Sequence, residues 1–388
     1  MPGTDADPWK IQYARNTRRH RPSPARSGSR RVDALLLDCD SATARPVGQR
    51  QGVRFIPQLA RSRYIVSRRW RQLTQERSIT CPEVVFAHTD TGSRTSATSG
   101  RSLEVSVVVP FRNAARTLGH QLEALANQDF SGPWEVIAVD NRSEDDSRRI
   151  AESFSERLHL RVVDARGRLG AGHARNVGAS HASGRKLLFV DADDEVDPGF
   201  VSTMAGALDR HDFVTSAFDQ ETLNPEWVRA AHGPAWRDRD RPLPDQFGVL
   251  PNAGASIGIS RAVFEAVGGF PEDLPRMQDI ALSWEVQRAG VQLHYVPDAL
   301  YRIRYRSTLP DLFRQGLAGS SCAPLLYKRY RGAGMQRRTV DAVVRSWARL
   351  AIDLSRARTR AELAPLAVRL GREIGRVTGS VRHRVFFP

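Results

Sequence analysis

Three carboxylates follow an apolar run in the middle of the chain. Asp191, Asp193 and Asp194 come directly after the run at 187–190, whose residues are typical of a buried strand. Clustered carboxylate oxygens are ligands that Mg²⁺ and Mn²⁺ prefer, and substrate phosphates often complete the coordination. The same residues also fit a solvated acidic turn that caps the helix expected from Asp197. The residues alone therefore leave both a divalent-metal site and an acidic turn open.

A glycine-rich turn precedes a helix that carries Arg175. The turn consists of Gly170, Ala171 and Gly172, and free N–H groups at such a helix start can bind phosphate by donating hydrogen bonds to it. It is not the dinucleotide fingerprint GxGxxG, because Arg175 stands where the third glycine is needed, and the chain has no P-loop motif. A plain helix start fits as well, so a phosphate site is one of two interpretations.

One further carboxylate with possible chemistry, Asp279, lies at the start of a later helix. Asp279 precedes an apolar helix face that includes Ile280, Leu282 and Val286. A carboxylate in this position either stabilises the positive end of the helix or acts as a general base. The chain has no GxSxG, no HExxH and no Cys/His cluster, so hydrolase and zinc chemistry have no support.

The elements that must position these groups alternate between strands and helices. Strand-like runs at 104–110, 134–140, 160–164 and 186–191 are separated by helical patterns at 114–128, 144–157 and 172–183. This alternation predicts βαβ units and a parallel sheet. Ligands bind outside the carboxyl ends of such strands, so Pro110, Asp140 and Asp191 are expected to converge on one crevice.

The pattern loosens beyond residue 219. Residues 224–250 are rich in Pro, Arg, Asp and Trp and are expected to form a long loop. The elements expected after it are helices at 261–267 and 279–289, strands at 291–297 and 299–306, and helices at 311–318, 338–357 and 361–377.

The basic charge lies at the two ends of the chain. The 388 residues include 58 Lys+Arg and 43 Asp+Glu, a net charge of +15. Residues 1–100 hold 18 basic and 8 acidic residues, residues 101–320 hold 25 and 31, and residues 321–388 hold 15 and 4. The linker-like composition of 1–100 predicts a disordered basic arm. No RNP, zinc-finger or helix-turn-helix pattern accompanies the arginines, so no nucleic acid is expected as a partner.

Two features bear on location. Cys39, Cys81 and Cys322 are far apart and odd in number, which excludes a disulfide framework and suits a reducing cytosol. The chain has no apolar run of about 18 residues and no secretory signal at its start, so a cytoplasmic protein is expected. The helix at 338–357 combines Trp347 and aliphatic residues with arginines, which is typical of an interfacial helix. An anionic membrane surface is therefore one expected partner, and packing of these helices on the rest of the protein fits the pattern equally well.

Taken in order, the motifs resemble those of the family 2 glycosyltransferases, which have the GT-A fold, over about residues 103–306. VSVVVPFRN at 105–113 resembles the opening strand VSVVVPVYN, VDNRSEDDS at 139–147 resembles VDDGSTDGS, LGAGHARNVG at 169–178 resembles GxxxARNxG, LLFVDADD at 187–194 resembles the DxD metal motif, GASIGISRAVFEAVGGF at 254–270 resembles the acceptor-side segment, and QDIALSWEVQRAG at 278–290 resembles EDxxLxxRxxxAG.

The resemblance implies an α/β fold with a Rossmann-like, mostly parallel sheet flanked by helices. It also implies inverting transfer of a sugar from a nucleotide-diphosphate sugar to an acceptor hydroxyl, with Mn²⁺ or Mg²⁺ as cofactor. Asp279 would be the general base, and Asp193 would hold the metal with Asp191 or Asp194. The residues implied on the nucleotide-sugar side are Pro110, Arg112, Asn113, Asp140, Asn141, Gly170, Arg175 and Asp191; those on the acceptor side are Gly254, Ser256 and Gln278.

The chain departs from the family pattern at four of these positions. Gln278 stands where Glu is usual, Asn141 replaces the second Asp of VDD, Arg112 replaces Tyr, and Ser256 replaces Asn. Without a neighbouring negative charge, the pKa of Asp279 should be raised less. An amide at 141 both donates and accepts hydrogen bonds, so the base of the donor nucleotide stays open. Gln278 and Asn141 also keep open a catalytically inactive scaffold.

The expected organisation has three parts. Residues 1–100 form the basic arm, residues 101–310 form the GT-A domain, and residues 311–388 form a basic amphipathic helical tail. The processive synthases of the family carry membrane spans and a QxxRW motif, and neither is found in this sequence. Non-processive transfer to a glycan or a lipid-linked acceptor of the cell envelope is therefore expected. A nucleic-acid-binding protein that uses arginine arms is the remaining alternative.

Overall fold

The computed structural model describes residues 103–232, 243, 245 and 247–388. The chain divides into two units, Met1–Gly92 and Ser93–Pro388, and every described residue belongs to the second unit. The predicted basic arm at 1–100 lies outside the described residues, and so do residues 233–242, 244 and 246 of the predicted loop at 224–250.

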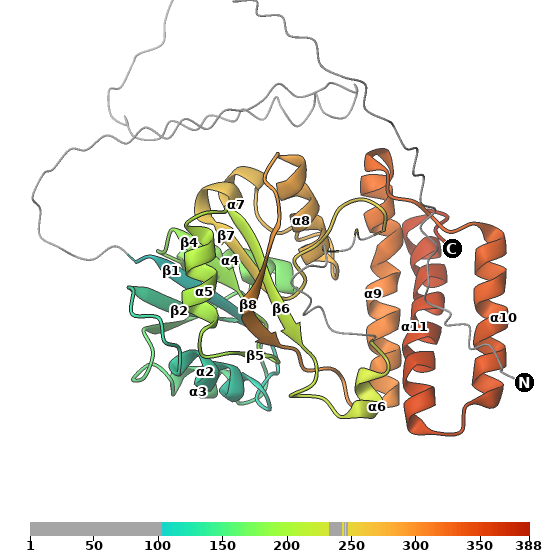
Figure 1. Cartoon of the computed structure of the whole chain (residues 1–388), viewed down its shortest axis with the longest axis horizontal. Helices are drawn as coiled ribbons and strands as arrows, with labels where there is room; N and C mark the ends of the chain where they lie inside the picture. The colour runs from blue at the N-terminus through green and yellow to red at the C-terminus, as the bar shows by residue number, and fades with distance from the viewer. Residues whose placement is uncertain (1–102, 233–242, 244, 246) are drawn as a thin grey trace, which may run out of the picture. The chain divides into compact units, whose positions relative to one another are not determined.

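The second unit contains one 8-stranded sheet with helices on both faces (Figure 1). Its strands, in order across the sheet, are β3 (Leu160–Asp164), β2 (Trp134–Asp140), β1 (Val105–Phe111), β4 (Lys186–Phe189), β7 (Ile257–Ser260), β6 (Phe213–Asp219), β8 (His294–Arg302) and β5 (Glu195–Val196). The pairs β1–β2, β1–β4, β2–β3 and β6–β8 are parallel. The remaining pairs are antiparallel, because β7 runs against β4 and β6, and β5 runs against β8. The expected α/β fold with a mostly parallel sheet is thus confirmed.

The central strand β1 shows why the sheet is covered on both faces. All seven of its residues are buried. Val107 and Val109 belong to one hydrophobic cluster, and Val108 between them belongs to another, as alternation along a strand requires. Strands of this kind are stable only when helices cover both sides of the sheet.

Two sets of helices provide that cover. On the side of Val107, the helices α2 (Leu118–Ala126), α3 (Ser147–Glu152) and α5 (Phe200–Leu208) contribute to the core. On the side of Val108, the helices are α4 (Ala171–His181), α7 (Arg261–Val267) and α8 (Gln278–Arg288). The helices α2 and α3 are shorter than the predicted 114–128 and 144–157, and α4 begins one residue before and ends two residues before the predicted 172–183.

The later elements differ more from expectation. The strands predicted at 291–297 and 299–306 are one strand, β8, which passes through Pro297 and Asp298 at a bulge opposite Ser216 and Ala217. Proline lacks an N–H group and is accommodated at such a bulge. The strands β5, β6 and β7 and the small helix α6 (Glu226–Arg229) were not predicted.

Three long helices follow the sheet: α9 (Leu309–Tyr330), α10 (Val340–Arg356) and α11 (Arg360–His383), with a short 3₁₀ turn η1 (Arg331–Ala333) after α9. Figure 1 shows α11 between α9 and α10. Glycines allow α9 and α11 to touch: a Cβ at Gly371 would lie 2.2 Å from the carbonyl oxygen of Phe313. At its other end, α9 packs Leu326 and Tyr330 against Trp284 of α8. The helical extension thereby supports the helix that begins at Gln278 and Asp279.

Candidate active site

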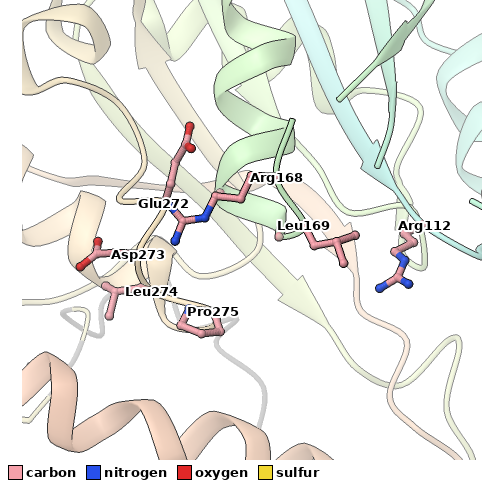
Figure 2. Close-up of a pocket in the computed structure, with 9 residues that line it drawn as sticks. Arg112, Arg168, Leu169, Glu272, Asp273, Leu274 and Pro275 are labelled. Atoms are coloured by element: carbon pink, nitrogen blue, oxygen red, sulfur yellow. The ribbon is translucent and has the colours of Figure 1, made fainter. Parts of the chain in front are cut away.

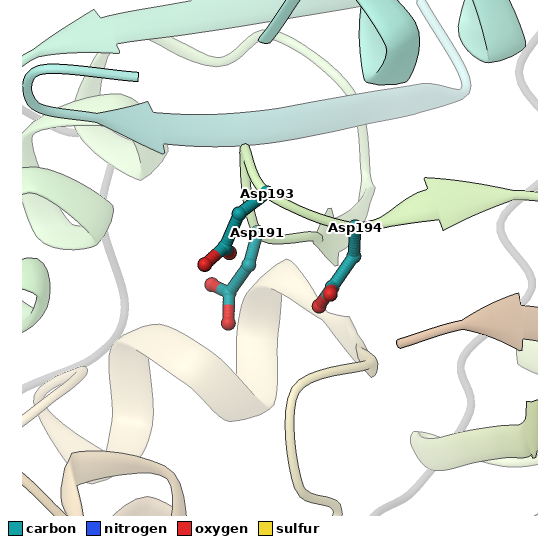
Figure 3. Close-up of side chains that lie close together, drawn as sticks. All are labelled: Asp191, Asp193 and Asp194. Atoms are coloured by element: carbon teal, nitrogen blue, oxygen red, sulfur yellow. The ribbon is translucent and has the colours of Figure 1, made fainter. Parts of the chain in front are cut away.

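The three clustered carboxylates lie in the loop between β4 and β5. One ligand atom from each of Asp191, Asp193 and Asp194 lies within 4.8 Å of the other two, and Figure 3 shows the three side chains on the same side of the loop. Burial raises the pKa of Asp193, and the charge of Asp191 raises it further. Burial and the charges of Asp193 and Asp191 also raise the pKa of Asp194. Three oxygen donors with such mutual repulsion fit a hard divalent cation, which would relieve it.

Buried groups from distant elements hold this loop in place. The hydroxyl of Tyr301, fully buried in β8, accepts from the Asp191 N–H at 2.8 Å and donates to the Asp194 carboxyl. The Gln121 side chain of α2 donates to the Asp191 carbonyl at 3.0 Å. The Arg304 N–H donates to Asp194 Oδ1 at 2.7 Å. None of these three supporting residues was predicted, because their separation from the loop in sequence leaves no local pattern.

Arg175 joins the metal-site candidate to the general-base candidate. Its guanidinium is buried in α4, donates to Asp191 Oδ1 at 2.5 Å and stacks over the ring of Phe270. Burial lowers the pKa of Arg175, but the charges of Asp191 and Asp279 more than offset this and raise it. In return, Arg175 opposes the rise in the pKa of Asp279 that burial causes. Arg175 therefore organises two carboxylates.

Two neighbouring residues at the start of α8, Met277 and Gln278, adopt energetically unfavourable arrangements. Gln278 is 4% exposed, and its Nε2 is a buried donor with no hydrogen-bond partner among the described residues. The residue before it, Met277, has φ 65°, a conformation that a non-glycine side chain rarely adopts. Asp279 follows and remains half-buried. Unpaired buried donors and left-handed residues both cost free energy, so this helix start is locally strained.

A cavity of about 240 Å³ lies near the end of β1 and the start of α4 (Figure 2). It is lined by Arg112, Arg168, Leu169, Gly170, Gly172, Glu272, Asp273, Leu274 and Pro275. Its two acids have partners in neighbouring elements, because Glu272 lies 3.0 Å from the His173 ring and Asp273 forms an ion pair with Arg329. Arg112 and Arg168 form no ion pair within the described ranges, although the charge of Arg168 acts on Glu272. The lining therefore offers two guanidinium groups to an anion.

The other predicted donor-side residues meet at the expected edge of the sheet. Pro110 lies within buried β1, and Phe111 is in register with Asp140 at the end of β2. Asp140 is 4% exposed, and its Oδ1 accepts from the Ser143 N–H at 2.8 Å. Asn113 has φ 50° and accepts from the Glu144 N–H at 2.8 Å. These carboxylate and amide groups therefore shape the two loops at the strand ends.

The predicted acceptor-side residues before β7 point mostly into the protein. Ser256 is fully buried, and its hydroxyl forms a hydrogen bond of 2.8 Å with the hydroxyl of Ser216. Gly254 has φ 65°, and a Cβ there would lie 3.0 Å from the ring of Phe218. The side chain of Ser256 therefore supports the segment from within.

The fold and the site define an α/β domain that gathers three carboxylates with the spacing of metal ligands, a partly buried fourth carboxylate and a cavity lined by two arginines at the ends of its strands. Residues 106–268 match the family model described as "Glycosyl transferase family 2". This part of the chain is a family 2 glycosyltransferase domain.

Individual relatives cover the chain only in part. The chain is 34% identical over 111 residues to the poly(ribitol-phosphate) beta-N-acetylglucosaminyltransferase TarS of Staphylococcus aureus (strain Mu50), which covers 28% of this chain and 19% of TarS. It is 27% identical over 230 residues to YibD of Escherichia coli (strain K12), an uncharacterized glycosyltransferase, which covers 55% of this chain and 65% of YibD. The mannosyltransferase PcManGT from Pyrobaculum calidifontis, solved with GDP-Man and Mn²⁺, aligns over 74% of this chain and 88% of its own, with a TM-score of 0.47 and 19% identity. The chain thus spans less than two thirds of TarS and of YibD.

Proposed function

We propose that this chain is an inverting, non-processive glycosyltransferase that moves one sugar from a nucleotide-diphosphate sugar to an acceptor hydroxyl. The observation that carries the proposal is the arrangement of the carboxylate triad, Arg175, Asp279 and the cationic cavity at one edge of the sheet. Their order and chemistry match what such a transfer requires: a site for a leaving diphosphate and a base for the attacking hydroxyl.

Each group has a part in that reaction. Asp191, Asp193 and Asp194 would hold Mn²⁺ or Mg²⁺, and the bound cation would neutralise the negative charge that develops on the leaving diphosphate. Asp279 accepts the proton of the acceptor hydroxyl as that oxygen attacks the anomeric carbon. Arg175 keeps Asp279 ionised, because its nearby positive charge favours the carboxylate form.

The cavity is proposed to take the nucleotide part of the donor. Arg112 and Arg168 supply positive charge and form no ion pair in the described ranges, although the charge of Arg168 also acts on Glu272. Gly170 and Gly172 lie at the start of α4. Backbone N–H groups at a helix start add to the attraction for phosphate. Glu272 and Asp273 form the opposite wall, where Glu272 contacts the His173 ring and Asp273 forms an ion pair with Arg329.

The acceptor is proposed to be a glycan or a lipid-linked sugar of the cell envelope. The similarity to TarS, whose name gives poly(ribitol-phosphate) as the acceptor, supports a polymeric acceptor. The sequence has no QxxRW motif, which favours transfer of single sugars. The motif content of the sequence also favours an enzyme that does not use nucleic acid as a partner.

We place the enzyme in the cytoplasm, at the inner face of an anionic membrane. Among the described residues, every exposed large hydrophobic side chain except Leu169 belongs to α10, α11 or the segment after α11. Val340 and Val344 are each 62% exposed and Val381 is 76% exposed, whereas Leu350 is buried. The described helices include none with the length and apolar character of a membrane span. Residues 321–388 carry 15 basic and 4 acidic residues, which an anionic lipid surface attracts.

A panel of labelled nucleotide sugars, each with Mn²⁺, tests the enzymatic proposal. The wild-type chain is expected to hydrolyse or transfer one donor, and Asp193→Ala is expected to lose that activity. Proton NMR of the product would show the inverted anomeric configuration. If the wild type and Asp193→Ala behave alike with every donor, the enzymatic proposal fails.

Co-sedimentation with anionic and neutral vesicles tests the location. The full chain is expected to sediment with anionic vesicles at physiological salt, and a Val340→Glu/Val344→Glu double variant is expected to bind more weakly. Equal recovery in the supernatant with and without anionic vesicles would contradict the membrane proposal.

A further inference from the structure

The side chain of Asn141 is enclosed by the segment that leads into α4. Its Nδ2 donates to the carbonyl oxygens of Ala165 at 2.6 Å and Arg168 at 2.8 Å, and its Oδ1 accepts from the Gly170 N–H at 2.8 Å. Asn141 is 4% exposed. One residue just beyond β2 therefore binds the segment 165–170 at its beginning, middle and end.

Only a carboxamide satisfies these three partners together. It offers two N–H hydrogens and a carbonyl oxygen, which match two carbonyl acceptors and one N–H donor. An ionised Asp offers only acceptors, so it would keep the Gly170 contact and turn its other oxygen toward the carbonyls of Ala165 and Arg168. The resemblance to the family gives Asp as the usual residue here, so the chain departs from the pattern where its own loop needs an amide.

The enclosed segment forms one wall of the cavity. Arg168, Leu169 and Gly170 all line it, and Gly170 begins α4 with φ 138°. The start of the segment has further support, because the Ala165 N–H donates to the Asp140 carbonyl at 2.8 Å. Within the described ranges, the hydrogen bonds that reach Arg168 and Gly170 from outside α4 come from Asn141.

We propose that Asn141 is a positioning residue that orders the segment 165–170 and so sets the wall of the nucleotide cavity. Both Nδ2 hydrogens donate within the protein and Oδ1 already accepts from the Gly170 N–H, so Asn141 has no hydrogen left to donate to a nucleotide base. Donor recognition depends on it indirectly, through the placement of Arg168 and the Gly170 N–H. The donor part of this inference rests on the proposed function, whereas the ordering of the segment does not.

Asn141→Asp tests the inference, because the substitution keeps the shape of the side chain and removes both donors. Hydrogen–deuterium exchange of the full chain is expected to be faster at 165–170 than in the wild type. Titration with UDP, GDP and dTDP, each with Mn²⁺, is expected to show about tenfold weaker binding of whichever nucleotide the wild type prefers, as for the loss of one net hydrogen bond. In turnover, KM for the donor should rise while kcat changes little.

Asn224→Asp is a matched control. Asn224 is 7% exposed, and its Nδ2 also donates to two carbonyls, those of Gln220 at 3.0 Å and Ile303 at 2.6 Å. Its Oδ1 accepts from the Tyr305 N–H at 2.7 Å. This variant loses the same chemistry elsewhere, so it should lower the melting temperature without faster exchange at 165–170.

The outcomes separate the inference from the proposed function. Unchanged exchange at 165–170 in Asn141→Asp overturns the inference, and so does faster exchange with unchanged nucleotide affinity. If the wild type binds none of the nucleotides, the proposed donor fails, and the exchange comparison still decides whether Asn141 orders the segment. Should Asn141→Asp fail to fold, Asn141→Ser, which keeps one donor, is expected to show the same changes to a smaller degree.

Discussion

Replacing Tyr301 with Phe should weaken the metal site without changing any carboxylate. The Tyr301 hydroxyl is fully buried, accepts from the Asp191 N–H at 2.8 Å and donates to the Asp194 carboxyl. Its removal leaves a buried N–H without a partner and takes a donor from a carboxylate. Each loss is expected to cost about 1–2 kcal/mol.

These losses act on the loop that would hold the metal, so they should appear as lower metal affinity. Removing a group that orients metal ligands typically costs between about 10-fold and 100-fold in affinity. We expect Mn²⁺ binding, measured by isothermal titration or by the loss of free Mn²⁺ signal in electron paramagnetic resonance, to weaken about tenfold in Tyr301→Phe.

Tyr330→Phe is the matched control for this experiment. Tyr330 is 1% exposed, and its hydroxyl donates to Glu285 at 2.7 Å, far along the chain from the carboxylate loop. Tyr330→Phe should lower the free energy of unfolding by about 1–2 kcal/mol, and Tyr301→Phe, which loses two hydrogen bonds, by about 2–4 kcal/mol. Only Tyr301→Phe should change Mn²⁺ affinity, and an affinity equal to that of the wild type would refute the role given to Tyr301.

Three further predictions concern packing and titration. Gly371→Ala should destabilise the chain by about 1–3 kcal/mol in urea denaturation, because its Cβ would lie 2.2 Å from a backbone carbonyl oxygen. Gly319→Ala is the control and should be neutral or stabilising, because nothing lies within 4 Å of its Cβ. Equal stability of the two variants would contradict the close packing of α9 and α11. Burial raises the pKa of Asp279 above 3.8, so kcat/KM should fall as pH drops through that raised value; a profile flat down to pH 4, or full activity in Asp279→Asn, would exclude it as the base. Despite burial, hydrogen bonds from Arg338 and the nearby charge of Arg376 lower the pKa of Glu373 from 4.5 to about 2. Its contribution of about 3 kcal/mol should be complete above pH 4.5 and lost as pH falls toward 2, so Glu373→Gln should be less stable than the wild type at pH 7 but not near pH 2.

Arg175 illustrates how far the sequence supports the site. Its place in the motif predicted a contact with phosphate, and the structure puts its guanidinium against Asp191 and near Asp279. The predicted phosphate contact and the observed carboxylate contacts both place Arg175 in the crevice at the strand ends. The partner could not be predicted, because the direction of a long side chain depends on which charges the neighbouring elements bring within its reach.

The core of the domain was predictable from local patterns. Apolar β-branched runs such as Val105–Phe111, separated by helical patterns, predicted the parallel half of the sheet and the edge at which its ligands gather. The strands β6 and β7 and the length of α9 were not predicted in this way. A strand such as β7, of four residues, owes its conformation to pairing with its neighbours.

The sequence by itself determined the α/β class, the clustering of Asp191, Asp193 and Asp194, and the resemblance to a glycosyltransferase family, because each depends on residues close together in the chain. The tertiary structure decided what surrounds those residues. It placed the Tyr301 hydroxyl of β8 against the loop that carries the three carboxylates, and it enclosed Asn141 within the segment 165–170. It also left Arg112 and Arg168 without ion pairs in the described ranges. These contacts join residues that lie far apart in the chain, and only the packing of strands and helices brings their donors and acceptors to hydrogen-bond distance.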